Sequence, residues 1–314
     1  MSFDWPKEIR VLVTGATGFV GRHLVGKLRD AGFHVTAAIR RESDAALFEA
    51  QNIPTWLSKP TGALDFIGPI DVVVHAAAKS QFPGVTVAQM SEDNVVLTRQ
   101  LLDAAERGGT PMFIFLSSVS VYGTIGAGVV DETTPMTDPG DYGMTKRLSE
   151  MLVEERARAM SGLAIRLPAV IGDGAARHWL AKAVYHLARN ESVSLFNPRA
   201  AFNNAIHIDD LATLIINAIR APWAGFETLT VACAGELTVR EVVERLRRGV
   251  GSASVLRETP SSKKSFTISF SRAAERFGFD PMDIGSALDR YAQTIRINHD
   301  HRAVPTTAAG AVAR

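Results

Sequence analysis

The sequence predicts an α/β protein built on a doubly wound parallel sheet, with a smaller α/β lobe toward the C-terminus. A β-branched run at residues 9–13 stops at a glycine cluster, as a buried parallel strand does. Short apolar runs then alternate with segments of helical periodicity as far as residue 168, which implies right-handed crossovers and a parallel sheet. Hydrophobic residues make up 46% of the 314 residues, enough for one large domain or two smaller ones.

The first half of the chain carries the strongest periodicity. The helix after the glycine cluster is expected because Val20, Leu24 and Leu28 recur at four-residue spacing, and Gly32 ends it. By the same criteria we expect strands at residues 9–13, 34–39, 71–75, 112–117 and 163–167, and helices at residues 19–31, 94–107 and 142–160.

The second half has a looser pattern. Helices are expected at residues 175–189, 209–219, 239–248 and 284–295, and extended segments at residues 202–208 and 228–233. We therefore expect residues 1–168 with 203–232 to form a dinucleotide-binding domain, and residues 169–202 with 233–300 to form a substrate-binding lobe. Residues 301–314 are rich in Ala, Thr and Gly and are expected to be a flexible tail.

Charge and composition restrict the possible partners. The net charge is +1, so no global field favours nucleic acid or an anionic membrane. A single cysteine, Cys233, rules out an intramolecular disulfide and a multi-cysteine zinc site, and no metal site is expected. Residues 1–10 lack the apolar core of a signal peptide, and no run approaches the roughly 20 apolar residues of a membrane span. We expect a soluble, cytoplasmic protein.

The glycine cluster is a candidate phosphate-binding loop. Gly15, Gly18 and Gly21 stand between the first strand and the first helix, where glycines allow a tight turn, close approach to a pyrophosphate and helix–strand packing. The helix that follows offers free N–H groups to the phosphates. Thr17, Phe19 and Val20 lie in the same segment and are expected to contact the cofactor. The alternative is a plain glycine-rich turn.

The end of the second strand indicates which dinucleotide would bind. An NAD site is expected to carry an acidic residue there, which bonds the ribose hydroxyls, but this strand ends in Arg40 and Arg41. Two guanidinium groups suit the 2′-phosphate of NADP, so we expect NADP, with NAD as the alternative. Both arginines could instead be solvated charges at a strand end.

Tyr142 and Lys146 form a candidate acid/base pair. They lie one helical turn apart on one face, where the ammonium group can lower the pKa of the phenol and let it exchange a proton with an alcohol or carbonyl oxygen. Ser118 ends a predicted parallel strand, at the edge where such sheets bind ligands. By itself the Tyr-x-x-x-Lys spacing is common, and a solvated helix face would also explain it.

Seven ordered motifs together resemble the extended short-chain dehydrogenase/reductase family, the group of nucleotide-sugar epimerases, dehydratases and reductases. The resemblance covers residues 9–212 and is weaker at residues 269–291. The motifs are Thr14-Gly15-x-x-Gly18-x-x-Gly21, His75-Ala76-Ala77-Ala78, Asn94-Val95, Ser117-Ser118-Val119-Ser120-Val121-Tyr122-Gly123, Tyr142-x-x-x-Lys146, Arg166-Leu167-Pro168 and His207-Ile208-Asp209-Asp210.

The resemblance implies a Rossmann-type fold and specific roles. Ser118, Tyr142 and Lys146 would be the catalytic residues, and Lys146 would also hold the nicotinamide ribose. The other cofactor contacts implied are Ala76, Ala77 and Ala78 beside the adenosine and ribose, Asn94 ordering the active-site region, and Pro168 against the nicotinamide. His75 is expected to be structural.

Departures from the family pattern affect the substrate. Val119 and Ser120 stand where the family's dehydratases carry an Asp-Glu pair, so loss of water is not expected. Asn203 and Asn204 stand near a position that often carries a diphosphate-binding arginine. The candidate substrate residues are Ser80, Ser118, Asn203 and Asn204, and Arg177, Arg199, Lys263 and Lys264 are possible substitutes for the missing arginine.

Three functions remain open. The first is an NADPH-dependent reductase of a keto group on a 4-keto nucleotide sugar. The second is a nucleotide-sugar epimerase that retains NAD, and the third is a non-catalytic dinucleotide-binding regulator on the same fold. The family's pairing of helices across a two-fold axis also implies a homodimer.

Overall fold

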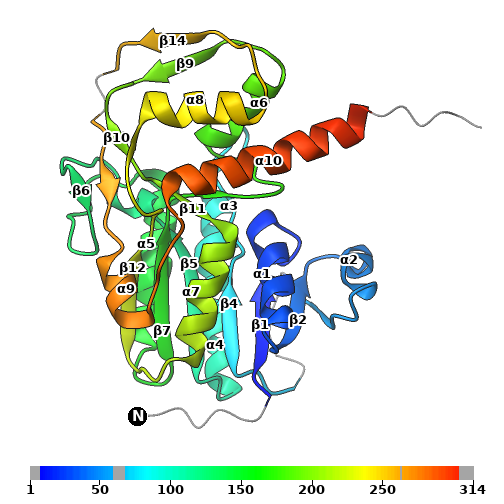
Figure 1. Cartoon of the computed structure of the whole chain (residues 1–314). Helices are drawn as coiled ribbons and strands as arrows, with labels where there is room; N and C mark the ends of the chain where they lie inside the picture. Colours follow the sequence, from blue (N-terminus) through cyan, green and yellow to red (C-terminus); the bar gives the residue numbers. More distant parts are fainter. Residues whose placement is uncertain (1–7, 59–67, 262–263, 304–314) are drawn as a thin grey trace, which may run out of the picture.

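The computed structural model describes residues 8–58, 68–261 and 264–303 (Figure 1). Up to residue 155 the elements are β1 Arg10–Thr14, α1 Phe19–Asp30, β2 His34–Ile39, η1 Glu42–Ala45, α2 Ala46–Glu49, β3 Thr55–Leu57, β4 Val72–His75, α3 Val87–Ser91, η2 Glu92–Val96, α4 Leu97–Arg107, β5 Met112–Ser118, η3 Val119–Tyr122, β6 Val129–Val130 and α5 Gly140–Glu155. The remaining elements are β7 Ser161–Leu167, β8 Ala169–Ile171, α6 Trp179–Ala188, β9 Val193–Phe196, β10 Ala201–Phe202, β11 Ala205–His207, α7 Ile208–Arg220, β12 Phe226–Thr230, β13 Leu237–Thr238, α8 Val239–Gly249, β14 Leu256–Thr259, β15 Thr267–Ile268, α9 Ser271–Phe277 and α10 Ile284–Ala303.

A seven-stranded sheet forms the centre of the molecule. Its strand order is β12-β7-β5-β4-β1-β2-β3, and every neighbouring pair in it is parallel. The chain leaves β1 toward β2 and later returns to β4 on the other side of β1, so the strand order reverses there. This arrangement confirms the predicted doubly wound parallel sheet, in which ligands bind beyond the carboxyl ends of the strands at the reversal point.

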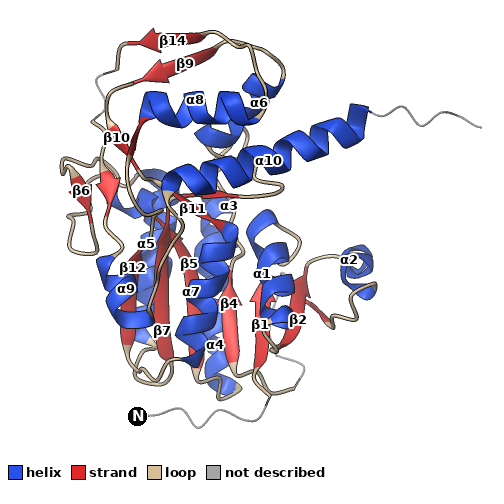
Figure 2. Ribbon diagram, in the orientation of Figure 1, coloured by secondary structure: helices blue, strands red, loops and turns tan. Residues whose placement is uncertain are grey.

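Helices cover both faces of the sheet (Figure 2). On one face α1 and α7 pack side by side, and α1 buries Leu24, Val25 and Leu28. On the other face α4 and α5 cover the strands, with Leu101 and Leu102 fully buried. The strands are apolar on both sides because each face meets a layer of helices.

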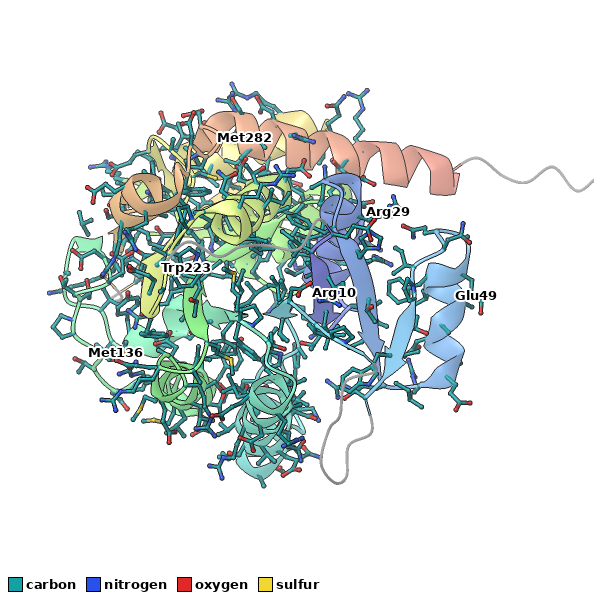
Figure 3. The ribbon with its side chains drawn as sticks, turned by 90° about the horizontal axis from the view of Figure 1, so that it is seen from below. Arg10, Arg29, Glu49, Met136, Trp223 and Met282 are labelled. Atoms are coloured by element: carbon teal, nitrogen blue, oxygen red, sulfur yellow. The ribbon has the colours of Figure 1, made fainter. Side chains whose placement is uncertain are left out.

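The amino ends of the strands lie at the opposite edge of the sheet, which Figure 3 shows from below. Arg10 begins β1, and its guanidinium group donates to both carboxylate oxygens of Asp71 at 2.8 Å. Trp223 lies in the turn before β12 and donates through its indole N–H to the Ala218 carbonyl at 2.8 Å. These contacts are far from the edge where the strands end, so they are structural.

A second lobe lies beyond the carboxyl ends of the sheet (Figure 1). Its core joins α6, α8 and α10 with β9 and β10. The chain crosses between the lobes through β8 and β11, which pair in parallel with Ile206 beside Val170. Ile206 and Val170 belong to the first core, whereas their neighbours Ala205 and Ile171 belong to the second. This strand pair therefore links the two cores.

The structure differs from the expected elements at several boundaries. The segment at 271–279 was expected in the second lobe, but Ala273, Phe277 and Phe279 are buried in the first core, because α9 packs against α7 and β12. Helix α5 ends at Glu155 rather than at residue 160, since the chain turns there to enter β7 at Ser161. Helix α10 continues to Ala303, and the rest of the expected tail lies outside the described residues.

The helix expected at 94–107 begins earlier and is irregular. Helix α3 runs into a single π-helical turn, η2, before α4 continues. Thr86 caps α3 by accepting a hydrogen bond from the Gln89 backbone N–H at 3.2 Å, and the Gln89 side chain bonds back. Turns of the π type inside helices often occur at functional sites, and this one contains Asn94.

Within the described residues, no helix is long and apolar enough to cross a membrane. The same residues contain no group of three or more His, Cys, Asp and Glu side chains that could hold a metal ion.

Candidate active site

The glycine loop is packed so closely that a side chain at Gly15 or Gly21 would collide with neighbouring backbone atoms. Gly15 has a φ of +65°, and a Cβ atom there would lie 2.7 Å from the Ala77 backbone nitrogen. A Cβ atom on Gly21 would lie 2.1 Å from the Gly15 carbonyl oxygen. The loop therefore lies directly against the Ala76–Ala77 segment after β4, and two glycines are required by contact.

The N-terminus of α1 is open toward this loop. Gly18 is its N-cap and provides no side-chain cap, so the first N–H groups of the helix are free for phosphate oxygens. Thr17 is exposed, while Phe19 and Val20 are half-buried on the first turn. The loop, the free helix end and the adjacent alanine segment fit a dinucleotide pyrophosphate.

A buried polar chain connects β1, β4 and α4 beneath the loop. The Thr14 hydroxyl contacts His75 Nδ1 at 2.6 Å, and His75 Nε2 contacts the Thr98 hydroxyl at 3.0 Å. Burial, together with the charge of Lys146, lowers the pKa of His75 to about 3. A neutral imidazole held between two hydroxyl groups agrees with the expected structural role.

The end of β5 and the start of α5 meet at the carboxyl edge of the sheet. Ser118 ends β5, and its hydroxyl accepts from the Ser120 backbone N–H and donates to the Ser120 hydroxyl, both at 3.1 Å. A Cβ atom on Gly143 would lie 2.1 Å from the Ser120 carbonyl oxygen. The first turn of α5, which carries Tyr142, is thus pressed against the segment after Ser118.

Tyr142 is largely enclosed, and its hydroxyl makes no hydrogen bond to any residue that the structure describes. Burial raises the pKa of Tyr142 to about 12. The sequence predicted a pKa lowered by Lys146, but the shift of Tyr142 is in the opposite direction, and its cause is the loss of water around the buried phenol. The hydroxyl is therefore a neutral proton donor at pH 7.

Lys146 lies one helical turn after Tyr142 and is 2% exposed. Its Nζ donates to the Leu116 carbonyl oxygen at 2.6 Å and lies 4.4 Å from the centre of the Phe115 ring. Burial lowers the pKa of Lys146 to about 7, and the nearby charge of Glu150 opposes this shift. The contacts with β5 fix the Lys146 side chain, although a charge costs free energy at a site that is buried from water.

Glu150, one turn after Lys146, is the fully buried anion of this region. Arg166 on β7 donates to both of its carboxylate oxygens, at 3.0 and 2.9 Å. Ser117 donates to the same carboxylate at 2.6 Å and Arg147 at 3.2 Å. Arg166 also donates to the Tyr122 hydroxyl at 2.9 Å. The network ties β5, β7, η3 and α5 together directly beneath the catalytic candidates.

Asn94 on η2 orders the loop after β4. Its amide oxygen accepts from the Lys79 backbone N–H at 2.7 Å, and its nitrogen donates to the Lys79 carbonyl at 3.0 Å and to Thr145 on α5 at 3.0 Å. Because one side chain joins the loop to α5, Asn94 fixes the distance between them.

The two arginines after β2 have different surroundings. Arg40 approaches Asp93 on η2, with Nη1 3.4 Å from Oδ1. Arg41 is more exposed and pairs with Asp44 on η1 at 3.1 Å. Of the two arginines, Arg40 therefore contacts η2, whereas Arg41 pairs locally within the segment after β2.

The candidate substrate residues are not all free to bind a ligand. The Asn203 amide donates to the Ile268 carbonyl at 2.9 Å and accepts from the Ile268 N–H at 2.8 Å, so this side chain anchors β15. Asn204 has a buried Oδ1 atom with no hydrogen-bond partner in the described part of the chain. Ser80 and Pro168 are half-buried, in the loop after β4 and at the end of β7.

The possible substitutes for the missing arginine do not all lie in one place. Arg177 of the second lobe lies over the Phe82 ring of the first, 5.1 Å from its centre, and so bridges the lobes. Arg199 and Lys264 line a separate cavity of about 600 Å³ beside residues 126–128. Lys263 lies outside the described residues.

Sequence reasoning missed several residues that the structure places around the site. Glu150 follows Lys146 at helical spacing, and Lys79 directly follows the alanine run, so each had a local signal. Thr98 and Thr145 had none, because only tertiary packing brings their hydroxyls to His75 and Asn94.

The end of β5, with Ser118, and the first turns of α5, with Tyr142 and Lys146, thus lie against each other at the carboxyl edge of the sheet that also carries the glycine loop. Such a set can exchange a proton with an alcohol or carbonyl oxygen next to a bound dinucleotide. This fold and site define the class of NAD(P)-dependent enzymes of the short-chain dehydrogenase/reductase type. Residues 11–232 match the NAD dependent epimerase/dehydratase family, and the chain belongs to that family.

Individual relatives extend over nearly the whole chain. The dTDP-4-dehydro-6-deoxy-D-allose reductase of Streptomyces sp is 26% identical, over 92% of this chain and 96% of that protein. The dTDP-6-deoxy-L-talose 4-dehydrogenase (NAD(P)(+)) of Kitasatospora kifunensis is 29% identical, over 80% and 82%. The structure of UDP-glucuronic acid 4-epimerase from Bacillus cereus in complex with NAD has a TM-score of 0.79 at 20% identity, covering 93% of this chain and 100% of that one, which shows the common fold.

Proposed function

We propose that the protein is an NADPH-dependent reductase of a keto group on a nucleotide sugar, with a 4-keto sugar as the substrate. The observation that carries this proposal is Arg40, which directly follows β2 where an NAD-binding chain would place a carboxylate. A reductase that exchanges its cofactor at each turnover draws on NADPH, and a guanidinium group at this position suits the 2′-phosphate.

In this proposal the chain supplies proton transfer and positioning. Tyr142 gives its phenolic proton to the carbonyl oxygen as that oxygen gains negative charge. Ser118 donates a hydrogen bond to the same oxygen after releasing Ser120. Lys146 stabilises the phenolate that remains and holds the nicotinamide ribose. When bound, the dinucleotide supplies the hydride.

The relatives support the substrate class, since two of them are named as enzymes that reduce or oxidise the 4-position of dTDP-sugars. Val119 and Ser120 carry no carboxylate, and Ser120 is hydrogen-bonded to Ser118. This arrangement offers no acid/base pair for elimination, which supports a reductase over a dehydratase.

A nucleotide-sugar epimerase that retains NAD is the second candidate. The ion pair between Arg40 and Asp93 favours it, because the carboxylate offsets part of the charge that would attract a 2′-phosphate. A non-catalytic regulator is the weaker third candidate, given the complete Ser118, Tyr142 and Lys146 set.

Absorbance at 340 nm during incubation with a 4-keto-6-deoxy nucleotide sugar tests the proposal. A reductase consumes one NADPH per sugar reduced, and Tyr142→Phe serves as the inactive control. An epimerase interconverts nucleotide hexoses with no net change in absorbance. No conversion of either substrate would favour the regulator.

We also propose a homodimer. Met144, Leu148 and Met151 follow one face of α5 at helical spacing, and each is more than 40% exposed. Val96 is partly exposed on the neighbouring η2 turn. An apolar face on two adjacent helices supports pairing with a second copy through four helices.

A further inference from the structure

One carboxylate beside the end of β2 holds two cations together. Asp93 contacts Lys79 Nζ at 2.5 Å through Oδ2 and Arg40 Nη1 at 3.4 Å through Oδ1. The cations come from the segments after β4 and after β2, and the carboxylate comes from η2. Elements far apart in the sequence thus place two positive groups at the carboxyl edge of the sheet.

The position of Lys79 is fixed at its backbone as well as at its side chain. Asn94, next to Asp93, bonds both the N–H and the carbonyl of Lys79. Adjacent residues of the π-helical turn therefore hold both ends of one lysine. The backbone and the ammonium group of Lys79 are therefore both held in place, although its side chain is one-third exposed.

The location corresponds to the adenosine end of a bound dinucleotide. In doubly wound folds the residue after the second strand meets the adenosine ribose, and an arginine there accommodates the 2′-phosphate. Arg40 holds that position, and Lys79 shares its carboxylate partner. The side chains of Arg40, Lys79 and Asp93 are 58%, 33% and 22% exposed, so a ligand can reach all three.

We propose that Lys79 joins Arg40 in binding the 2′-phosphate of NADP(H), and that Asp93 is an internal counter-ion that limits this affinity. The inference rests on the proposed use of NADPH. Arg40 offers a planar fork of donors and Lys79 a compact charge. Asp93 keeps the two cations together when no phosphate is present, and its negative charge opposes the phosphate when one arrives.

Asp93→Asn tests the counter-ion directly. The amide keeps an oxygen that can accept from Lys79 and Arg40 but carries no charge, so NADPH should bind about fivefold more tightly, the effect expected of one partly screened charge at this range. NADH affinity should not change. Fluorescence titration of each reduced dinucleotide measures both values, and the gain for NADPH should shrink as salt is raised.

Lys79→Gln tests the second cation. NADPH affinity should fall about tenfold, the loss expected for one charge-assisted contact, again with NADH unchanged. Asp30→Asn and Arg29→Gln are matched charge controls, since these residues form an exposed ion pair at the far end of α1, where Figure 3 labels Arg29. Neither control should alter the affinity for NADPH relative to NADH, and thermal melting checks that all four variants fold.

The possible failures can be told apart. Equal loss of NADPH and NADH affinity in Lys79→Gln would assign the lysine to a part common to both dinucleotides and would overturn the inference. Weaker NADPH binding in Asp93→Asn would make Asp93 a scaffold rather than a counter-ion and would also overturn it. If neither change altered the preference of the protein for NADPH over NADH, the inference would be overturned and the proposed use of NADPH would stand. If the wild type bound NADPH and NADH with equal affinity, both the inference and the proposed use of NADPH would be overturned.

Discussion

At the residue scale, the active-site candidates combine a neutral phenol with a lysine that is difficult to keep charged. Tyr142 is enclosed without a hydrogen-bond partner among the described residues, and Lys146 is buried against β5. Each side chain is poorly solvated alone. In the proposed mechanism the ammonium group stabilises the phenolate that Tyr142 leaves, so proton release from Tyr142 should depend on Lys146.

Three substitutions at these residues should give different losses. Tyr142→Phe removes one hydroxyl, so cofactor binding should persist while turnover falls by a factor on the order of 10²–10⁴. Lys146→Ala should reduce both turnover and cofactor affinity, and Ser118→Ala mainly turnover. Steady-state rates and dinucleotide titration separate these effects. Near-normal turnover in Tyr142→Phe would refute the proposed proton donor.

Lys146 should also leave a signature in the pH dependence of stability. Its pKa is about 7 in the folded chain, against 10.5 for an exposed lysine. Below pH 7 both states bind the proton, and the burial penalty is complete. Between pH 7 and 10.5 only the unfolded state keeps the proton, so the unfolding free energy gains up to about 1.4 kcal/mol per pH unit from this group.

Urea unfolding of the wild type and Lys146→Met at pH 7 and pH 9.5 measures this gain. The wild type should gain stability over this range relative to the variant, in which residue 146 does not titrate. Equal changes in both proteins would mean that Lys146 keeps an ordinary pKa in its buried position.

At the element scale, the contact between α5 and η3 determines where Tyr142 lies. Gly143→Ala introduces a methyl group 2.1 Å from a backbone oxygen, so α5 must shift away from Ser120. The variant should lose stability and turnover, although alanine is ordinarily better than glycine in a helix by about 1 kcal/mol.

Gly26→Ala is the matched control for that substitution. Gly26 is also within a helix, and a Cβ atom there would meet nothing within 4 Å. This variant should gain roughly 0.5–1 kcal/mol, measured by thermal or urea unfolding. If both variants gained stability, the close approach of α5 to η3 would be wrong.

The accuracy of the sequence-based predictions also varies by element. Strand β2 was predicted with its observed bounds, because its apolar run is framed by Gly32 and by charged residues. Strands β8, β9 and β14 have three or four residues each and pair with distant segments. No local sequence pattern identifies these three strands, because pairing with their partner strands makes them extended.

For the candidate site too, the features with a local sequence signal were predicted and those that depend on tertiary packing were not. The glycine loop and the Tyr142–Lys146 spacing are local, so the sequence predicted them. The ion pair of Arg40 with Asp93 joins residues 53 positions apart, and the pairing of Glu150 with Arg166 requires β7 to lie beside α5. Charge pairs of this kind depend on the folded topology, which periodicity alone does not specify.

At the scale of the whole molecule, the apolar face of α5 should control assembly. Leu148→Arg places a charge in the proposed interface and should convert a dimer into a monomer, because an unpaired buried charge is costly. Light scattering at micromolar concentration should give twice the 33.9 kDa of one chain for the wild type and a single chain for the variant.

Val255→Arg is the control, since Val255 is 62% exposed in the second lobe, away from α5. Its mass should match that of the wild type. A wild-type mass near that of one chain would contradict the dimer.

The order in which the chain is synthesised gives the edge strand β12 another role. Strand β7 ends at Leu167, and its outer partner β12 begins only at Phe226. Six of the seven residues of β7 are buried in the complete sheet. While the ribosome makes the intervening segment, which takes on the order of 3–12 seconds, β7 presents an apolar edge with unpaired backbone groups. Such edges recruit other strands and start aggregation. The nascent chain should therefore need a holding chaperone until β12 emerges and covers that edge.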